Sequence, residues 1–144
     1  MAYDANNVFA QILEGKMLAH KVFENDHTLA FLDIMPVSLG HTLIVPKAEA
    51  ENIFELENEP GSEVFKTTRK VARGVQASLN PTGLIITQLN GTDAGQTVFH
   101  YHMHIIPVYE NMPLRMHGKK IEDTEALAKT AKIIKQAVVD ISAD

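Results

Sequence analysis

The sequence predicts an α+β protein with an antiparallel sheet and helices packed on one face of it. Three observations predict this class. Short runs of β-branched and apolar residues are joined by compact polar turns, which indicates hairpins. Two longer segments show helical periodicity, and they follow groups of strands rather than alternating with single strands. A chain of 144 residues with 45% hydrophobic content is long enough to bury the core of one domain.

The first half of the chain opens with a short helix. Apolar side chains lie at helical spacing over Val8–Glu14, and Gly15 ends the segment. A polar turn at residues 25–27 predicts a hairpin between two strands. Three strands are expected in this half, at residues 21–24, 28–32 and 41–45, the last closed by Pro46.

A longer helix follows these strands. Residues 51–56 predict a helical turn. Val64, Val71, Val75 and Leu79 lie near helical spacing in the segment 62–79. Ser62 is a suitable N-cap, and Asn80-Pro81 is the expected stop.

The second half predicts two strands and a C-terminal helix. Leu84–Leu89 is rich in β-branched residues, and residues 90–95 have turn chemistry before a last strand, so a hairpin is expected. Residues 112–120 show no periodicity. From about Asp123 to Ile141, apolar residues alternate with lysines in the pattern of an amphipathic helix.

Composition excludes several classes of function. The chain has no cysteine, which excludes disulfides and thiolate chemistry. A net charge of −5 gives no basic surface for nucleic acid. The sequence has no apolar run long enough to span a bilayer and no basic segment followed by an apolar one at its start, so we expect a cytoplasmic protein without a membrane partner.

The most informative stretch is Gly95–Pro107, GQTVFHYHMHIIP. In an extended chain, successive side chains point to opposite faces. His100, His102 and His104 would then share one face that looks toward a cavity or solvent. The opposite face, formed by Phe99, Tyr101, Met103 and Ile105, would lie on the core. Imidazoles can ligate a metal, shuttle protons near neutral pH, or attack phosphorus as nucleophiles.

This stretch resembles the histidine triad (HIT) family of nucleotide hydrolases and transferases. Residues 100–106 have the family's form H-φ-H-φ-H-φ-φ, and Gly95-Gln96 stands where the family has its own Gly-Gln. Residues 31–47, FLDIMPVSLGHTLIVPK, resemble the nucleoside-binding half. The resemblance, which includes VFAQILEGK near the start, fades beyond Pro107.

The resemblance implies about five strands per subunit and a homodimer that joins two sheets. We expect one domain over residues 1–144, with a core at 5–110 and an extension containing the last helix at 111–144.

The resemblance also implies catalytic roles. His102, the middle histidine, would attack the α-phosphate of a nucleotide and form a nucleotidyl-histidine that water resolves. His104 would contact the phosphate or the leaving group, and His100 would orient the site or simply support it by hydrogen bonding. Gln96 and Thr97, at the strand entrance, would stabilise charge on the phosphoryl oxygens.

A second group of residues would bind the nucleoside. Asp33 follows an apolar strand directly, where its carboxylate could accept hydrogen bonds from both ribose hydroxyls or cap local N–H groups. His41 is expected to supply a supporting hydrogen bond. The base would be enclosed by apolar side chains, namely Phe9, Phe31, Ile34 and Leu43.

The sequence departs from the family at two places. Asn7, Ala10 and Glu49 stand where relatives often have zinc ligands, so we expect no structural zinc and no cofactor. Leu89 stands where relatives have Asn or Gln, and a leucine cannot donate a hydrogen bond. Either a contact to the nucleotide is lost, or a neighbour such as Asn90 supplies it.

The favoured function is hydrolysis of a purine nucleoside phosphoramidate or a related nucleotide through His102. Three alternatives stay open. The first is a dinucleoside polyphosphate hydrolase with the same triad. The second is a hydrolase in which the three imidazoles hold zinc. The third is a nucleotide-binding sensor with little turnover.

Overall fold

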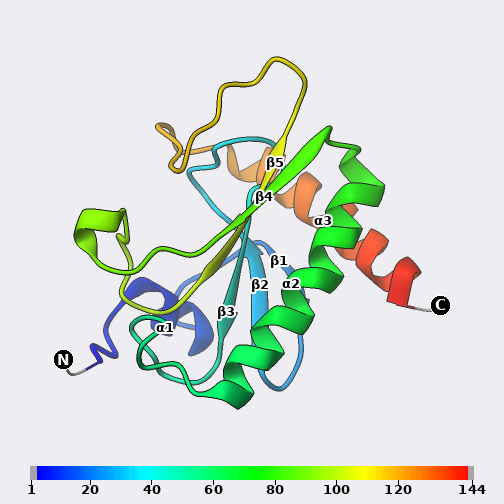
Figure 1. Ribbon diagram of the computed structural model, residues 1–144. Coiled ribbons are helices and arrows are strands. Elements are labelled where there is room, and N and C mark those ends of the chain that lie inside the picture. The colour runs from blue at the N-terminus through cyan, green and yellow to red at the C-terminus, as the bar shows by residue number, and fades with distance from the viewer. Residues whose placement is uncertain (1–2, 143–144) are drawn as a thin grey trace.

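The computed structural model describes residues 3–142, and Figure 1 shows a single twisted sheet between helices. The α+β class with a five-stranded antiparallel sheet is confirmed. In chain order the elements are α1 (Val8–Leu13), β1 (Lys21–Glu24), β2 (Thr28–Leu32), β3 (Thr42–Pro46), α2 (Asn58–Leu79), β4 (Gly83–Thr87), the 3-10 turn η1 (Thr92–Ala94), β5 (Met103–Val108) and α3 (Thr124–Ser142).

The strands lie in the order β1-β2-β3-β5-β4, and every neighbouring pair is antiparallel. β5 therefore lies inside the sheet, between β3 and β4. Its register places His104 beside Leu43 on β3 and beside Thr87 on β4. The predicted hairpin of the last two strands is confirmed as a pairing, although a long excursion through η1 separates the two strands.

The two long helices pack together on one face of the sheet and close it (Figure 1). Ile44 and Ile105 from the sheet meet Val71 and Val75 of α2 and Ile134 of α3 in the main core. The helices approach closely because α2 has a glycine, Gly74, at the contact, where a Cβ would lie 2.6 Å from Val138 Cγ2. The C-terminal helix, which the family resemblance does not cover, is thus part of the core.

Of the helices within residues 3–142, the short helix α1 alone packs on the opposite face (Figure 1). Asn7 caps α1 by accepting a hydrogen bond from the Ala10 N–H, and Gly15 follows the helix with a φ of +80°. Phe9 and Ile12 pack against Phe31 and Leu43 in a second, smaller core. Because a six-residue helix cannot cover five strands, part of this face stays open.

Most predicted elements match the structure, and the start of α2 is wrong. The expected N-cap was Ser62, but the helix begins at Asn58, and its cap Glu57 makes no side-chain hydrogen bond. Pro60 lies in the first turn, where the N–H that proline lacks has no helical partner. Residues 51–55 form turns and bends, and β4 ends at Thr87, two residues before the predicted end.

The predicted histidine strand is also shorter than expected. β5 begins at Met103, so His100 and His102 precede it, and the chain bends over residues 98–100. The reason is that this part of the backbone pairs with a loop instead of with β4: the Tyr101 N–H donates to the Ala50 carbonyl at 2.8 Å. Phe99 consequently lies outside both core clusters and lines an open groove.

None of the helices within residues 3–142 combines the length and the apolar character that crossing a membrane requires.

Candidate active site

A cavity of about 250 Å³ opens on the face of the sheet that α1 only partly covers. Its walls come from α1, the ends of β2 and β3, the approach to β5, and the segment after β5. Of the predicted site residues, eight line it: Phe9, Phe31, Asp33, Ile34, Leu43, Thr97, His102 and His104. The structure therefore brings the predicted apolar wall and two of the three imidazoles together at one cavity.

His102 presents a free nitrogen lone pair at this cavity. Its Nδ1 lies 2.7 Å from the carbonyl oxygen of His100. A carbonyl oxygen can only accept, so Nδ1 carries the proton and donates it. In the neutral ring Nε2 is then unprotonated, and no described residue engages it in a hydrogen bond. Phe9 stands edge to face against the ring, with centroids 4.9 Å apart, and fixes its plane.

His104 presents the opposite kind of group, an N–H donor. The Val37 N–H donates to Nδ1 of His41 at 3.0 Å, so the proton of the neutral His41 ring is on Nε2. That Nε2 lies 3.0 Å from Nδ1 of His104, which must accept. His104 therefore carries its proton on Nε2. Among the buried side-chain nitrogen and oxygen atoms of residues 3–142, this Nε2 alone lacks a hydrogen-bond partner.

His100 does not line the cavity. Its Nε2–H donates to the Pro46 carbonyl at 2.8 Å, and its Nδ1 accepts from the hydroxyl of Tyr3. Both ring nitrogens are engaged, and the ring is fully buried. The same residue offers its backbone carbonyl to His102. The imidazole therefore fits the supporting role, the second of the two expected from the sequence, and it is the backbone of His100 that orients His102.

Burial keeps the imidazoles of the site neutral. It lowers the pKa of His41 and of His102 from 6.5 to about 4, and that of His104 to about 3. The neighbouring rings add to this effect because a second positive charge nearby would be unfavourable. Burial also lowers the pKa of His100. The tautomers deduced from the hydrogen bonds therefore describe the site at neutral pH.

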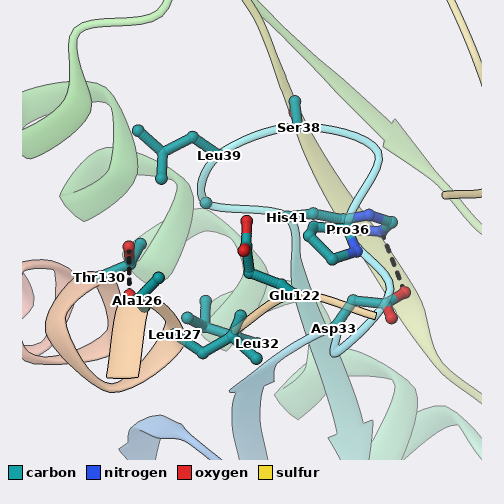
Figure 2. Close-up of a pocket in the computed structure, with 11 residues that line it drawn as sticks. Leu32, Asp33, Pro36, Ser38, Leu39, His41, Glu122, Ala126, Leu127 and Thr130 are labelled. Carbon is teal, nitrogen blue, oxygen red and sulfur yellow. Dashed lines mark hydrogen bonds and ion pairs between the residues drawn. The ribbon is translucent and has the colours of Figure 1, made fainter. Parts of the chain in front are cut away.

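Asp33 lies at the end of β2 and faces two ways. One carboxylate oxygen accepts from the Met35 N–H at 2.9 Å. The other lies 3.6 Å from His41 Nε2, and Figure 2 marks this contact with a dashed line. Burial raises the pKa of this carboxyl group. Beside it, a small pocket of about 30 Å³ reaches Glu122 and the start of α3, which is room for roughly one water molecule.

Two further predicted site residues, Gln96 and Asn90, also lie outside the cavity. Gln96 is buried, and its amide nitrogen donates to the carbonyls of Glu51 and Val98 while its oxygen accepts from the Gly91 N–H. Asn90 accepts from the Ile53 N–H at 2.9 Å. Both side chains hold the loops that flank the cavity. The sequence shows that these two residues are polar, but it does not show that other parts of the chain already use their hydrogen-bonding groups.

Leu89 also lies outside the cavity. It follows the end of β4 and contacts Gly95, so that a Cβ on the glycine would lie 3.2 Å from Leu89 Cδ1. His41, by contrast, makes the supporting hydrogen bond predicted for it.

The cavity has residues that sequence reasoning missed. His117 lines its mouth, and so do Met17 and Leu18 from the turn after α1. His117 belongs to a segment without periodicity, and nothing in its spacing links it to the other histidines. Its presence among only seven histidines was the one available signal.

The donors present do not fit the family's structural zinc. Ala10 has no ligand atom, the amide oxygen of Asn7 caps α1, and Tyr3 bonds the ring of His100. Asp33, His41 and His104 do bring one donor atom each within 4.8 Å of one another. However, His41 accepts at Nδ1 and so carries a proton on Nε2, the atom that would have to ligate. Instead, Val37, His41 and His104 form a chain of hydrogen bonds, and Asp33 lies beside it without a hydrogen bond to His41.

The fold and the site define an α+β protein whose cavity pairs an imidazole lone pair with an imidazole N–H. The HIT domain family matches residues 14–111. Protein hit of Bacillus subtilis is 46% identical over 104 residues, which is 72% of this chain and 72% of the relative. An adenosine 5′-monophosphoramidase of Schizosaccharomyces pombe is 37% identical over 100 residues, 69% of this chain and 72% of the relative.

Solved structures agree with this match. The crystal structure of a HIT-like protein from Bartonella henselae has a TM-score of 0.88 and 38% identity, and it covers 94% of this chain and 99% of its own. The chain therefore belongs to the HIT domain family, as the alternating histidines predicted.

Proposed function

We propose that the protein cleaves purine nucleoside 5′-phosphoramidates at the α-phosphate through a nucleotidyl-His102 intermediate. One observation carries the proposal: the hydrogen bonds give His102 a free Nε2 and give His104 an unpartnered Nε2–H at the same cavity. A nucleophile and a donor for the phosphoryl oxygens are the two groups that phosphoryl transfer requires first. The name of the fission yeast relative, an adenosine 5′-monophosphoramidase, supports the same substrate class.

The substrate would lie along the cavity from its apolar wall to its imidazoles. Phe9, Phe31, Ile34 and Leu43 would enclose the base. The carboxylate oxygen of Asp33 that faces the cavity would accept from the ribose hydroxyls, while the other oxygen stays on the Met35 N–H.

At the phosphate, His102 Nε2 would attack phosphorus, and the His100 carbonyl would stabilise the positive charge that develops on the ring. The His104 Nε2–H would donate to a non-bridging oxygen. Because this N–H is desolvated and already oriented by His41, its interaction with developing negative charge costs little reorganisation. Thr97, exposed at the mouth, would contact the phosphate from the other side. Water would then release the nucleotide from His102.

The test is a substrate panel with acid-quench trapping. Purified protein is mixed with adenosine 5′-phosphoramidate, a dinucleoside polyphosphate and AMP, and the intermediate is sought by mass spectrometry of peptides that contain His102. We expect turnover of the phosphoramidate and a mass increase by one adenylyl group. The variant His102→Ala should lose on the order of 10⁴-fold in kcat or more. The control His27→Ala removes an exposed histidine outside the cavity and should retain activity.

The outcomes separate the alternatives. Faster turnover of the polyphosphate would favour that substrate class, and binding without turnover would favour a sensor. Activity that is lost with EDTA and restored by zinc would favour the metal-dependent reaction. Adenylylation of a residue other than His102 would refute the assigned nucleophile.

We also propose a homodimer formed through β4. β4 is an edge of the sheet, and its Ile86 side chain is 45% exposed. An edge strand with exposed apolar residues is a natural template for pairing with another strand. Phe65 on the neighbouring helix α2 is 66% exposed and extends this surface. Sedimentation at micromolar concentration should give a dimer, and a monomer would refute it. The cytoplasmic location stays a prediction.

A further inference from the structure

The segment after β5 contributes one side chain to the cavity wall and is held against the loop that follows β2. This segment, residues 109–123, is called the strap below, and it has no regular secondary structure apart from turns and bends. The Glu122 N–H donates to the Ile34 carbonyl at 2.8 Å. Gly118 lies so close to the turn at residues 35–36 that a Cβ would overlap the carbonyl oxygens of that turn. The strap is therefore held in place by its contacts with the loop that follows β2.

The strap brings His117 to the mouth of the cavity. The ring shares the cavity with His102 and His104, and its Nε2 lies 3.1 Å from the position that a Cβ on Gly95 would take. Unlike the buried imidazoles of the site, His117 is exposed, and no hydrogen bond to its ring is found within residues 3–142. It can therefore exchange protons with solvent.

The buried imidazoles have no spare proton to give to a leaving group. His102 and His104 each hold one proton, on Nδ1 and Nε2 respectively, and burial disfavours a second one on either ring. An amine, however, leaves phosphorus readily only if its nitrogen receives a proton as the P–N bond breaks. His117 is the cavity-lining imidazole that is free to deliver it.

We propose that His117 is the general acid that protonates the leaving group, an inference that rests on the proposed function. As His102 Nε2 forms its bond to phosphorus, the bond from phosphorus to the amine breaks and its electron pair stays on the amine nitrogen. That nitrogen takes the proton of the His117 imidazolium and leaves as a neutral amine. In the second step water attacks phosphorus, the bond to His102 breaks, and the neutral His117 accepts the proton that water loses. Each ring thus returns to its starting state.

The charges around His117 are those of the site itself. Asp33 faces it from the end of β2, His41 from the start of β3, and His102 and His104 from β5 and its approach.

The experiment compares two substrates that differ in their need for an acid. Adenosine 5′-(N-butyl)phosphoramidate expels an alkylamine and needs a proton, whereas the p-nitrophenyl ester of AMP expels a stable phenolate and does not. Both are assayed with the wild type, with His117→Asn, and with Leu114→Ala, a control on the same strap whose side chain is 73% exposed and does not line the cavity.

We expect His117→Asn to lose about 10²-fold in the rate at which the butylamide adenylylates His102. We expect it to stay near wild type in the burst of phenolate that the ester releases, because that burst precedes the attack of water. The Kd for AMP should not change, and Leu114→Ala should resemble the wild type on both substrates. Equal losses on the two substrates would overturn the inference and indicate a structural role, and an unchanged butylamide rate would overturn it as well. A wild-type protein that cleaves the ester but no phosphoramidate would overturn the proposed function instead.

Discussion

The two faces of the sheet bury their side chains equally well, but one face forms the main core and the other lines the cavity. Ile44 and Leu43 are neighbours on β3, and they are 0% and 3% exposed. Ile44 points toward α2 and α3, helices of 22 and 19 residues that close its face. Leu43 points toward α1, a helix of six residues, and lines the cavity. The length of the covering helix, more than the burial of the strand, separates core from site.

The largest effect that this comparison predicts is a difference in stability and in KM between two matched substitutions on β3. Ile44→Ala removes packed methyl groups from the closed face and should lower the free energy of unfolding by about 2–5 kcal/mol, with the KM of the folded enzyme unchanged. Leu43→Ala should destabilise less because its site already borders open space, and it should raise KM. Urea unfolding and steady-state kinetics measure both quantities. An equal rise in KM in the two variants would show that the closed face also affects substrate binding.

A second prediction concerns the polar part of the open face. His41→Leu removes the donor that fixes the tautomer of His104, and we expect kcat to fall by about 10–100-fold. His41→Gln keeps an N–H donor within reach of His104 Nδ1 and should retain most of the activity. If the two variants lose activity equally, the hydrogen bond to His104 is not what His41 contributes.

The third prediction is that acid destabilises the open face. His41, His102 and His104 have folded pKa values of about 3–4, against 6.5 in the unfolded chain. Below about pH 6.5 the unfolded chain binds protons that the folded protein does not, so stability is present above that pH and is lost as pH falls toward 4.

Each of these imidazoles should contribute up to about 1.4 kcal/mol per pH unit to this loss. The raised pKa of Asp33 acts in the opposite sense and offsets part of it. Urea unfolding at pH 7 and pH 5 measures the difference. His104→Gln should reduce it, whereas His27→Gln, at an exposed position, should not. An equal pH dependence in all three proteins would contradict the assignment.

The sequence predicts an element of this structure well where residues near one another in the chain determine it. The short helix α1 with its glycine stop, the first hairpin and the start of α3 depend on local signals, and the predictions there are confirmed. The extent of the last strand depends on a distant segment, because the Ala50 carbonyl accepts from the Tyr101 N–H. The alternation of histidines nevertheless indicated the family correctly.

The tautomers of the site were out of reach of the sequence for the same reason. They depend on Val37 for His41, and on Tyr3 and Pro46 for His100, partners that only the folded chain brings together. His117 was missed because the strap has neither periodicity nor hairpin chemistry that would place it.

The smallest effect is expected near the rim of the cavity, at Leu89, the position where the family resemblance leads us to expect an amide side chain. Leu89→Asn would place a donor beside Gly95 and His117, at the cavity mouth. A hydrogen bond to a charged phosphate is worth about 1.5–3 kcal/mol, which corresponds to roughly tenfold or more in affinity or rate. Because Leu89 does not line the cavity, the amide must reach in from the rim, and we expect a gain at the lower end, about tenfold or less.

Kinetics with the phosphoramidate and calorimetry with AMP measure this gain, and Leu89→Ala is the control that removes the leucine without adding a donor. Improvement in Leu89→Asn but not in Leu89→Ala would show that the amide, and not extra space, is responsible. If neither variant improves while both unfold in urea at the wild-type midpoint, Leu89 serves to pack Gly95 at the rim, and the phosphate lies nearer to His104 than to this turn.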